Sequence, residues 1–398
     1  MIDFEISPQV KRGLKAAREV NVNLIRKLSG YYDEYEHEHD DIKEADEINK
    51  ASLKIMAAMA PKPGEEAAKG AAVGGIIIAE ERAWGDPGLS LGASTSGLGN
   101  AAIGAVATDE QKKRFGSKYA SMAITEPGAG SDTAAITTTA KLDPDTNEWI
   151  INGEKIFITG GARSQLVVIW ATLDKSMGRA AIKSFVVEKG TPGMTLSKLE
   201  NKLGIRASDT ASIVFEDCRI PYENILGSPE IKPKKTTASG FKGVMKTFDV
   251  TRPAVAAQAI GVAQAALDFT KEKLEEEGFQ FPYDRGQHSL TATQRDIMDM
   301  EVNLEAARLL TWRAASMLET GQRNSLEASF GKAKAGRAAT LVCQKCVALL
   351  GPLGYSREWL LEKFMRDCKI TDIFEGTGQI QMLIIARNIL GFSREMLK

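Results

Sequence analysis

A carboxylate stands in an apolar setting near the C-terminus, in the segment Ile373-Phe-Glu-Gly-Thr-Gly-Gln379. The flanking segments have helical composition, so Glu375 is expected in a loop between two helices, held still yet reachable. Packing beside Ile373 and Phe374 would raise the pKa of the carboxyl, as a general base near neutral pH requires. The alternative is a solvated helix cap, the usual role of a lone Glu in such a loop.

A second polar cluster, Thr125-Glu-Pro-Gly-Ala-Gly-Ser131-Asp132, follows the first predicted strand. Its glycines expose backbone N–H groups, and Thr125 and Ser131 add hydroxyls, so a planar polar ligand or a phosphate would suit it. A tight turn capped by Ser131 and Asp132 is the alternative. A third segment, Phe157-Ile-Thr159-Gly-Gly161, is by itself an ordinary strand end.

The composition excludes several classes of protein. A chain of 398 residues predicts two or three domains. The 51 basic and 52 acidic residues give a net charge of −1, which favours neither nucleic acid nor an acidic membrane surface. Apolar runs are far too short for a membrane span, and the first residues lack the pattern of a signal peptide. Four cysteines favour a reducing compartment, so we expect a cytoplasmic protein.

Two groups of residues resemble metal ligands in spacing only. Cys343 and Cys346 have no second pair nearby and are expected to be small core residues on a helix. His37 and His39 lie in an acidic stretch that is expected to be a solvated face or loop. We therefore predict no metal site.

Hydrophobic periodicity divides the chain into three regions, 1–118, 119–230 and 231–398. The first and third are predicted to be helical and the middle one to be all-β. Asn152-Gly153 is predicted to be a hairpin turn. Predicted helices cover 10–28, 48–59, 71–84, 253–274, 293–320, 325–350, 360–370 and 381–390. Predicted strands cover 122–125, 137–142, 148–151, 154–159, 166–172, 182–188 and 211–218.

Together with Phe248-Asp-Val-Thr-Arg-Pro253, the three clusters and the helical–β–helical order resemble the acyl-CoA dehydrogenase family over essentially the whole chain. The resemblance implies an α+β multidomain fold with an N-terminal helical domain, a middle β-barrel domain and a C-terminal four-helix bundle. It also implies FAD between the last two domains, an acyl-CoA substrate, and a homo-oligomer, most often a tetramer.

The resemblance assigns roles to residues of each cluster. Glu375 matches the catalytic base. Positions that match FAD contacts are Met122, Ile124, Thr125, Ser131, Phe157, Ile158, Thr159, Thr377 and Gln379. Positions that match substrate contacts are Ser131, Asp249, Thr251, Arg252 and Gly376.

The implied reaction is α,β-desaturation of the thioester. Glu375 would remove the α-proton while the backbone N–H of Glu375 and a ribityl hydroxyl of FAD hold the carbonyl. The β-hydrogen would leave as hydride to the flavin N5, giving a trans-2-enoyl-CoA, and an electron-transfer flavoprotein would take the electrons. Some relatives carry the base on the helix of the Asp-x-x-Arg motif; here the equivalent residue is Thr251, which cannot act as a base.

Two positions depart from the family pattern. Where the family has an Arg that binds the FAD pyrophosphate, this chain has Glu277, with Arg285 as a possible substitute. Where the family has a Gln, this chain has Ala348. These changes predict that the ADP half of FAD is bound differently. They leave two alternatives open, a non-catalytic subunit that binds acyl-CoA or a partner, and a flavin oxidase on the same fold.

Overall fold

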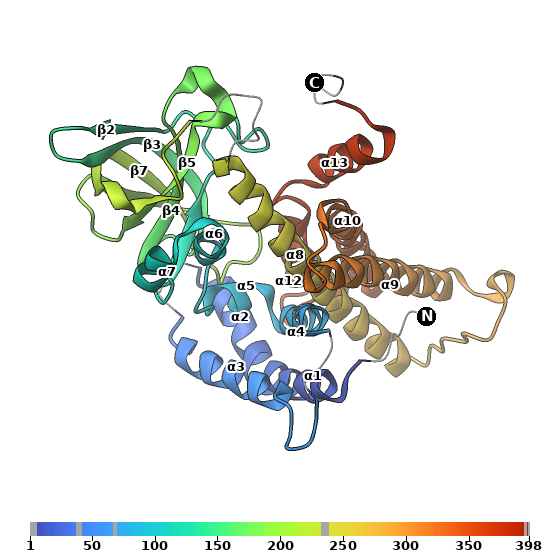
Figure 1. Cartoon of the computed structure of the whole chain (residues 1–398). Coiled ribbons are helices and arrows are strands. Elements are labelled where there is room, and N and C mark those ends of the chain that lie inside the picture. The colour runs from blue at the N-terminus through green and yellow to red at the C-terminus, as the bar shows by residue number, and fades with distance from the viewer. Residues whose placement is uncertain (1–5, 37–41, 67–69, 232–238, 394–395, 397–398) are drawn as a thin grey trace.

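The computed structural model describes residues 6–36, 42–66, 70–231, 239–393 and 396; His37 and His39 lie outside these ranges (Figure 1). The chain begins with helices, passes through a sheet and returns to helices, as the periodicity predicts. The first helices are α1 (Pro8–Val20), the π-helical η1 (Asn21–Ile25), α2 (Arg26–Glu34), α3 (Ala45–Met59), α4 (Ala71–Gly85), α5 (Pro87–Gly92), α6 (Leu98–Val106) and α7 (Asp109–Phe115).

The middle region forms one mixed sheet of eight strands, in which the main path runs β6-β7-β3-β2-β4-β5-β8 and β1 pairs with β4. Most neighbours are antiparallel, but β4 is parallel to both β1 and β2. The prediction omitted β6 and β8. The strands are β1 (Ala120–Ala123), β2 (Thr139–Asp143), β3 (Glu148–Thr159), β4 (Leu166–Thr172), β5 (Ile182–Glu188), β6 (Met194–Leu199), β7 (Thr210–Pro221) and β8 (Ile225–Leu226), with short 3-10 turns η2 (Lys175–Ala181) and η3 (Tyr222–Asn224).

The predicted hairpin at Asn152-Gly153 is wrong. Both residues lie inside the continuous strand β3, at a shift in its register against β7. Gly153 has φ 149°, and a Cβ there would lie 2.4 Å from the hydroxyl of Thr138, the residue before β2. The Asn-Gly pair therefore provides a bulge with a close strand approach rather than a reversal of the chain.

Strand β4 is buried along its whole length because both faces of the sheet are covered. Val167, Ile169 and Ala171 belong to the apolar cluster on one face. Alternate residues Leu166, Val168 and Trp170 belong to the cluster on the other, which includes residues of α6 and α7. A strand covered on both sides reads as a continuous apolar run, which explains why its bounds were predicted correctly.

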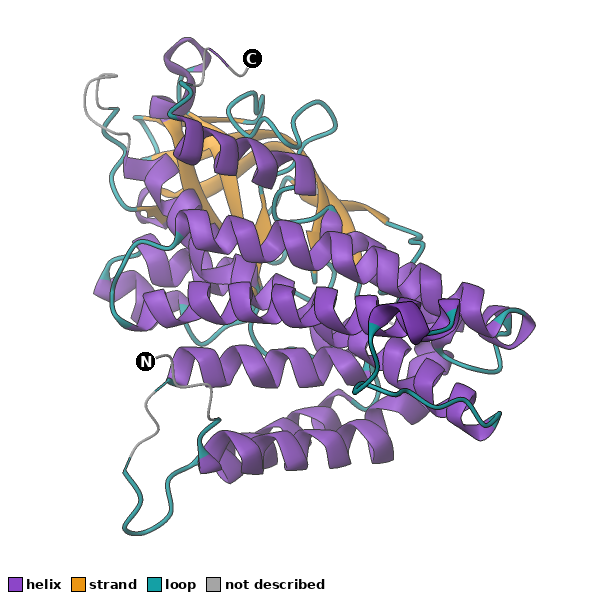
Figure 2. Cartoon of the chain, turned by 90° about the vertical axis from the view of Figure 1, so that its right-hand side faces the viewer, coloured by secondary structure: helices purple, strands orange, loops and turns teal. Residues whose placement is uncertain are grey.

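The C-terminal helices pack as a bundle, and Figure 2 shows them stacked in front of the sheet and above the first helices. On α9 the residues Leu304, Ala307, Thr311 and Ala314 are buried at three- and four-residue steps, as packing in a bundle requires. Cys343 and Cys346 lie in the bundle core. The helices are α8 (Ser239–Glu276), η4 (Gln287–Ser289), α9 (Ala292–Glu319), α10 (Ser325–Leu350), α11 (Pro352–Tyr355), α12 (Leu361–Lys369), η5 (Ile370–Asp372) and α13 (Gly378–Leu390).

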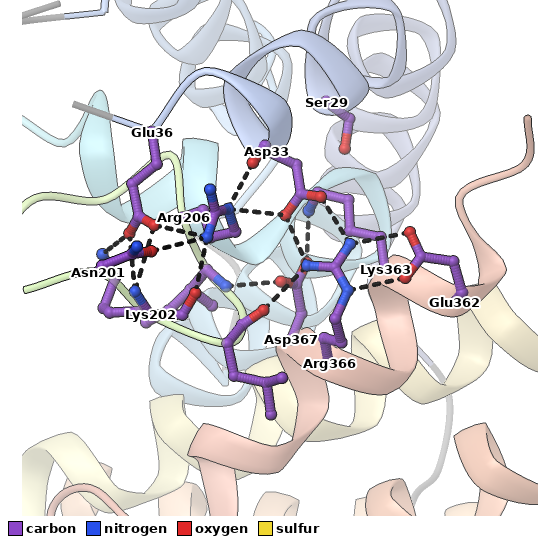
Figure 3. A network of polar contacts seen from close by, with 12 residues as sticks. Ser29, Asp33, Glu36, Asn201, Lys202, Arg206, Glu362, Lys363, Arg366 and Asp367 are labelled. Atoms are coloured by element: carbon purple, nitrogen blue, oxygen red, sulfur yellow. Dashed lines mark hydrogen bonds and ion pairs between the residues drawn. The ribbon is translucent and has the colours of Figure 1, made fainter. Parts of the chain in front are cut away.

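A buried ionic cluster joins the three regions (Figure 3). The Lys363 ammonium on α12 contacts Asp86, which caps α5, at 2.7 Å, and also contacts Asp367. Asp367 accepts a hydrogen bond from the backbone N–H of Ile205, 2.6 Å away in the β region. Ser29 of α2 donates to Asp86. All three charged side chains are almost fully buried, so their mutual pairing offsets a large desolvation cost.

Replacing Lys363 with Met should lower the free energy of unfolding by about 3–5 kcal/mol, because Asp86 and Asp367 would remain as buried carboxylates without their cation. Urea unfolding followed by circular dichroism measures this loss. Lys112→Met is the matched control, since Lys112 forms an exposed pair with Asp109 and should change stability by less than about 1 kcal/mol. Equal effects of the two variants would contradict the role of the cluster.

Candidate active site

Glu375 lies in the turn between η5 and α13, as the sequence predicts. Its backbone is left-handed, with φ 53°, and Gly376 follows with φ 92°. The positive φ of Gly376 favours a glycine there, and a Cβ at that position would also displace the Gln381 amide, which would lie 2.6 Å away. That amide donates to the carbonyl of Gly376 at 3.0 Å and to that of Glu375 at 3.4 Å.

The Glu375 carboxylate faces α8. Its Oε2 accepts a hydrogen bond of 2.6 Å from the Thr251 hydroxyl. Burial raises the pKa of Glu375, while the Thr251 bond and the nearby Arg252 and Lys332 cations oppose that rise. The shift has the predicted direction, but Ile373 is exposed and does not provide the apolar cover that the sequence suggested. The helices α8 and α10 provide the surroundings instead.

The other charged residues of the α8 motif pair with each other. Arg252 is 3% exposed and lies 3.3 Å from the Asp249 carboxylate. Asp249 also accepts from Ser325, and its carbonyl accepts from Asn324 at 3.0 Å. The Arg252 Nε has no partner among the described residues. Asp249 and Arg252 therefore bind each other and neighbouring protein groups beside Thr251. Their contact with substrate stays a prediction.

The loop after β1 is anchored by a buried ion pair that the sequence analysis did not assign. The Lys155 ammonium on β3 lies 2.7 Å from the Glu126 carboxylate and donates to the carbonyl of Ile124 at 3.1 Å. Glu126 also accepts from the backbone N–H groups of Thr137 and Thr138. These contacts lower the pKa of Glu126 to about 2. Thus, the loop is rigid at its base.

The remaining residues of this loop differ in exposure. Met122 and Thr125 are half-buried, Ile124 is buried, and Ser131 is exposed. The Thr125 carbonyl accepts from the N–H of Ile156 at 2.9 Å, which ties the loop to β3. Asp132 accepts from the N–H of Ala134, so the turn at the end of the loop is capped by Asp132. No hydrogen bond of Ser131 is formed within the described residues.

Phe157 is presented to solvent at an irregularity of β3. The register against β7 shifts between Lys155 and Ile158, and Phe157 has φ 57° and is 61% exposed. An exposed Phe in a left-handed conformation is costly, and such positions concentrate at functional sites. Ile158 is fully buried in the sheet core, so only its backbone can reach a ligand. Thr159 is half-buried, and its carbonyl accepts from Ser121.

Helix α8 brings the loop and the carboxylate together. Phe248 packs against the apolar cluster that contains Ile124. Thr251, on the next turn of the same helix, binds Glu375. The contacts that α8 makes with this cluster and with Glu375 therefore start roughly one helical turn apart, about 5 Å along the helix axis. Figure 1 shows α8 running between the sheet and the helices α10 and α13.

Thr377 and Gln379 lie beyond the base, at the start of α13. The Thr377 side chain accepts from the N–H of Ile380 and caps the helix, and Gln379 is exposed. Their contact with FAD stays a prediction. The Gly376 carbonyl accepts hydrogen bonds from the Lys332 ammonium and from the Gln381 amide.

The residues present fit the flavin ring that the resemblance implies. Phe157 offers a flat apolar face beside the loop, and the hydroxyls of Thr125 and Thr159 form no hydrogen bond within the described residues. Unpaired hydroxyls beside an exposed ring match a planar ligand with both apolar and hydrogen-bonding edges. The positions that were compared with the family's contacts to the ADP half of FAD are different in character. Glu277, Arg285 and Ala348 are all exposed.

Four polar residues that hold the site were missed by the sequence analysis: Glu126, Lys155, Lys332 and Gln381. All are buried. A usable signal existed for Lys332, because it stands four residues from Ala328 and from Gly336, on the buried side of α10. A lysine in such a row of small residues indicates an internal partner.

Among the described residues, no group of three or more His, Cys, Asp and Glu side chains could hold a metal ion. Within the same ranges, no helix combines the length and apolar character needed to cross a membrane.

Lys155→Met should lower the free energy of unfolding by about 3–5 kcal/mol, because it leaves the buried Glu126 carboxylate without its cation. The double variant Lys155→Met/Glu126→Gln should recover part of that loss, since no buried charge remains. Urea unfolding measures both. Lys198→Met is the control, because Lys198 is exposed and paired with Glu200. A double variant less stable than Lys155→Met would contradict the ion-pair interpretation.

Known proteins resemble this chain in sequence and in fold. The rat mitochondrial short-chain specific acyl-CoA dehydrogenase is 42% identical over 276 residues, which span 69% of this chain and 64% of that protein, just under two thirds of it. The short-chain specific acyl-CoA dehydrogenase of Clostridium acetobutylicum is 33% identical over 98% of this chain and 100% of its own.

A solved structure is also similar to this chain in sequence and in fold. Butyryl-CoA dehydrogenase from Megasphaera elsdenii superposes with a TM-score of 0.81 at 32% identity, covering 98% of this chain and 100% of that one. The family models for the acyl-CoA dehydrogenase middle domain and C-terminal domain match residues 121–218 and 238–390. These matches include the loop after β1, the Phe157 strand end, the α8 motif and Glu375, and the chain belongs to the acyl-CoA dehydrogenase family.

Proposed function

We propose that this protein is an FAD-dependent acyl-CoA dehydrogenase that converts an acyl-CoA thioester to a trans-2-enoyl-CoA, with Glu375 as the base. The observation that carries the proposal is the Glu375 carboxylate itself. It has a raised pKa, a hydrogen bond from Thr251 and a left-handed backbone in a rigid turn. A strained, half-buried carboxylate, bound by a helix that also packs against the flavin-compatible loop, is a functional arrangement rather than a helix cap.

The chain's own residues act on the α-proton. Glu375 in its ionised form removes the proton from the α-carbon of the thioester, and Thr251 holds the carboxylate in position. The Glu375 backbone N–H is our candidate donor to the thioester oxygen, where negative charge develops as the proton leaves. When bound, FAD supplies the acceptor for the hydride that leaves the β-carbon. Loss of one proton and one hydride forms the double bond.

We infer a short acyl chain. The relatives from rat and Clostridium are named as short-chain specific, and the Megasphaera structure is named for a butyryl-CoA enzyme. Residues Ser131, Asp249, Thr251, Arg252 and Gly376 are proposed to contact the substrate, and Met122, Ile124, Thr125, Ser131, Phe157, Ile158, Thr159, Thr377 and Gln379 to contact FAD. For Ile158 that contact is through the backbone.

The assembly and partners complete the proposal. We propose a homotetramer of chains with domains 1–118, 119–230 and 231–398, an electron-transfer flavoprotein as electron acceptor, a role in β-oxidation of fatty acids, and a cytoplasmic location. Exposed apolar residues on α9, α10 and α13, among them Val302, Leu341, Met382 and Ile389, support association with further copies.

Two alternatives are separated from this proposal by one measurement. Purified protein is mixed anaerobically with butyryl-CoA while the flavin absorbance is followed. Bleaching that reverses only with an added electron acceptor supports a dehydrogenase. Bleaching that air reverses rapidly, with hydrogen peroxide formed, supports a flavin oxidase. Protein that stays colourless with added FAD supports the non-catalytic subunit.

Glu375→Gln should retain bound flavin and lose about 10²–10⁴-fold in the rate of flavin reduction by butyryl-CoA, because the amide cannot accept the α-proton. Stopped-flow absorbance under anaerobic conditions measures the rate. The control is Glu358→Gln, an exposed carboxylate that should leave the rate unchanged. A Glu375→Gln protein with normal reduction would end the assignment of the base.

Thr251→Val should move the acidic limb of the reduction rate to higher pH by about one unit. The Thr251 bond lowers the pKa of Glu375, so removing it raises the pH at which the base ionises. A hydrogen bond to a charged group contributes about 1.5–3 kcal/mol, and one pKa unit corresponds to about 1.4 kcal/mol. Thr251→Ser retains the hydroxyl and should keep the limb in place. A limb that does not move in Thr251→Val would show that the bond is unimportant.

A further inference from the structure

Lys332 is an ammonium group in the interior of the helix bundle. It is 1% exposed and stands on α10 beside Gly331, Ala335 and Gly336. Lysine is almost never fully buried unless it is paired, because taking its charge out of water is costly. Burial lowers its pKa to about 8. The cost of this arrangement requires a compensating contact.

The contact is with the backbone next to the proposed base. The Lys332 Nζ donates to the carbonyl of Gly376 at 2.7 Å. The same carbonyl accepts from Gln381 at 3.0 Å. The charges that act on Lys332 come from Asp372, Glu375 and Arg252. Its ammonium is therefore placed to act on the Glu375 turn in two ways, through the Gly376 carbonyl and through its charge.

The turn needs a hydrogen bond of this kind because its backbone conformation is unfavourable. Glu375 has φ 53°, in the left-handed region that a residue with a side chain adopts only at a cost in free energy. The turn is also short, lying between the end of η5 at Asp372 and the start of α13 at Gly378. Lys332 is the charged one of two donors to the Gly376 carbonyl, so its loss would leave the peptide after Gly376 less constrained and let the Glu375 carboxylate move away from Thr251.

We propose that Lys332 is a positioning residue for Glu375, because its ammonium holds the Gly376 carbonyl and thereby fixes the left-handed turn that presents the carboxylate to Thr251. This inference rests on the proposed function, in which Glu375 is the base. Lys332 touches the backbone of the turn rather than the reacting atoms.

The test compares Lys332→Met with Lys334→Met in the holoenzyme. Lys334 is the matched control, since it is a half-buried lysine on the same helix that donates to Asn303 instead. The first readout is amide hydrogen exchange, by mass spectrometry, of peptides covering residues 373–381. We expect about tenfold faster exchange there in Lys332→Met and no change in Lys334→Met. This readout needs no turnover.

The second readout is steady-state turnover with butyryl-CoA and an artificial electron acceptor across pH. We expect kcat of Lys332→Met to fall about 10–100-fold while KM changes less than about threefold. The acidic limb should also move to higher pH, because the Lys332 charge lowers the pKa of Glu375. A role limited to stability would lower the yield of folded protein without moving the limb.

Unchanged exchange at 373–381 together with unchanged kcat would overturn the proposal, as would a loss seen only in KM. If Lys332→Met does not fold, Lys332→Gln, which keeps a polar group without the charge, is measured with the same readouts and the same expected directions. Failure of the proposed function is recognised separately, because Glu375→Gln would then keep normal turnover whatever the exchange of the turn.

Discussion

Taking a carboxylate out of water raises its free energy, and the contacts around Glu375 offset that rise without neutralising the group. Thr251 hydrogen-bonds to the carboxylate, while the Arg252 and Lys332 cations act on it through space. Burial outweighs these effects, so the pKa stays above its ordinary value. A base for a weakly acidic carbon needs this balance, because full pairing would remove its basicity and full burial would leave it protonated.

The balance depends on helices that converge from distant parts of the chain. Helix α8 carries Thr251 and Arg252, α10 carries Lys332, and the turn before α13 carries Glu375. The buried cluster of Asp86, Lys363 and Asp367 joins α12, which leads into that turn, to α5 and to the β region. A disturbance of this cluster would therefore shift the segment that carries Glu375 relative to the sheet that carries Phe157.

The sheet side of the site depends on a different kind of interaction. The Lys155–Glu126 pair fixes the loop after β1 at its base, while the shift in register of β3 turns Phe157 outward. Lys155 and Phe157 are only two residues apart on β3, so the anchor of the loop and the exposed ring lie on the same short segment of chain. Rigid backbone around an exposed ring lowers the entropy lost when a planar ligand is bound.

The sequence by itself determined the order of the regions, most helices, the fully buried strands and Glu375 at a break between helices. Those features follow from local spacing, as in Leu166–Thr172, where burial on both faces leaves an unbroken apolar run. Tertiary structure alone decided that Asn152-Gly153 forms a bulge and that Lys332 and Lys155 are buried. Each depends on a partner distant in sequence or on how neighbouring elements pack, and hydrophobic periodicity reports which side of an element is buried but not what it meets there.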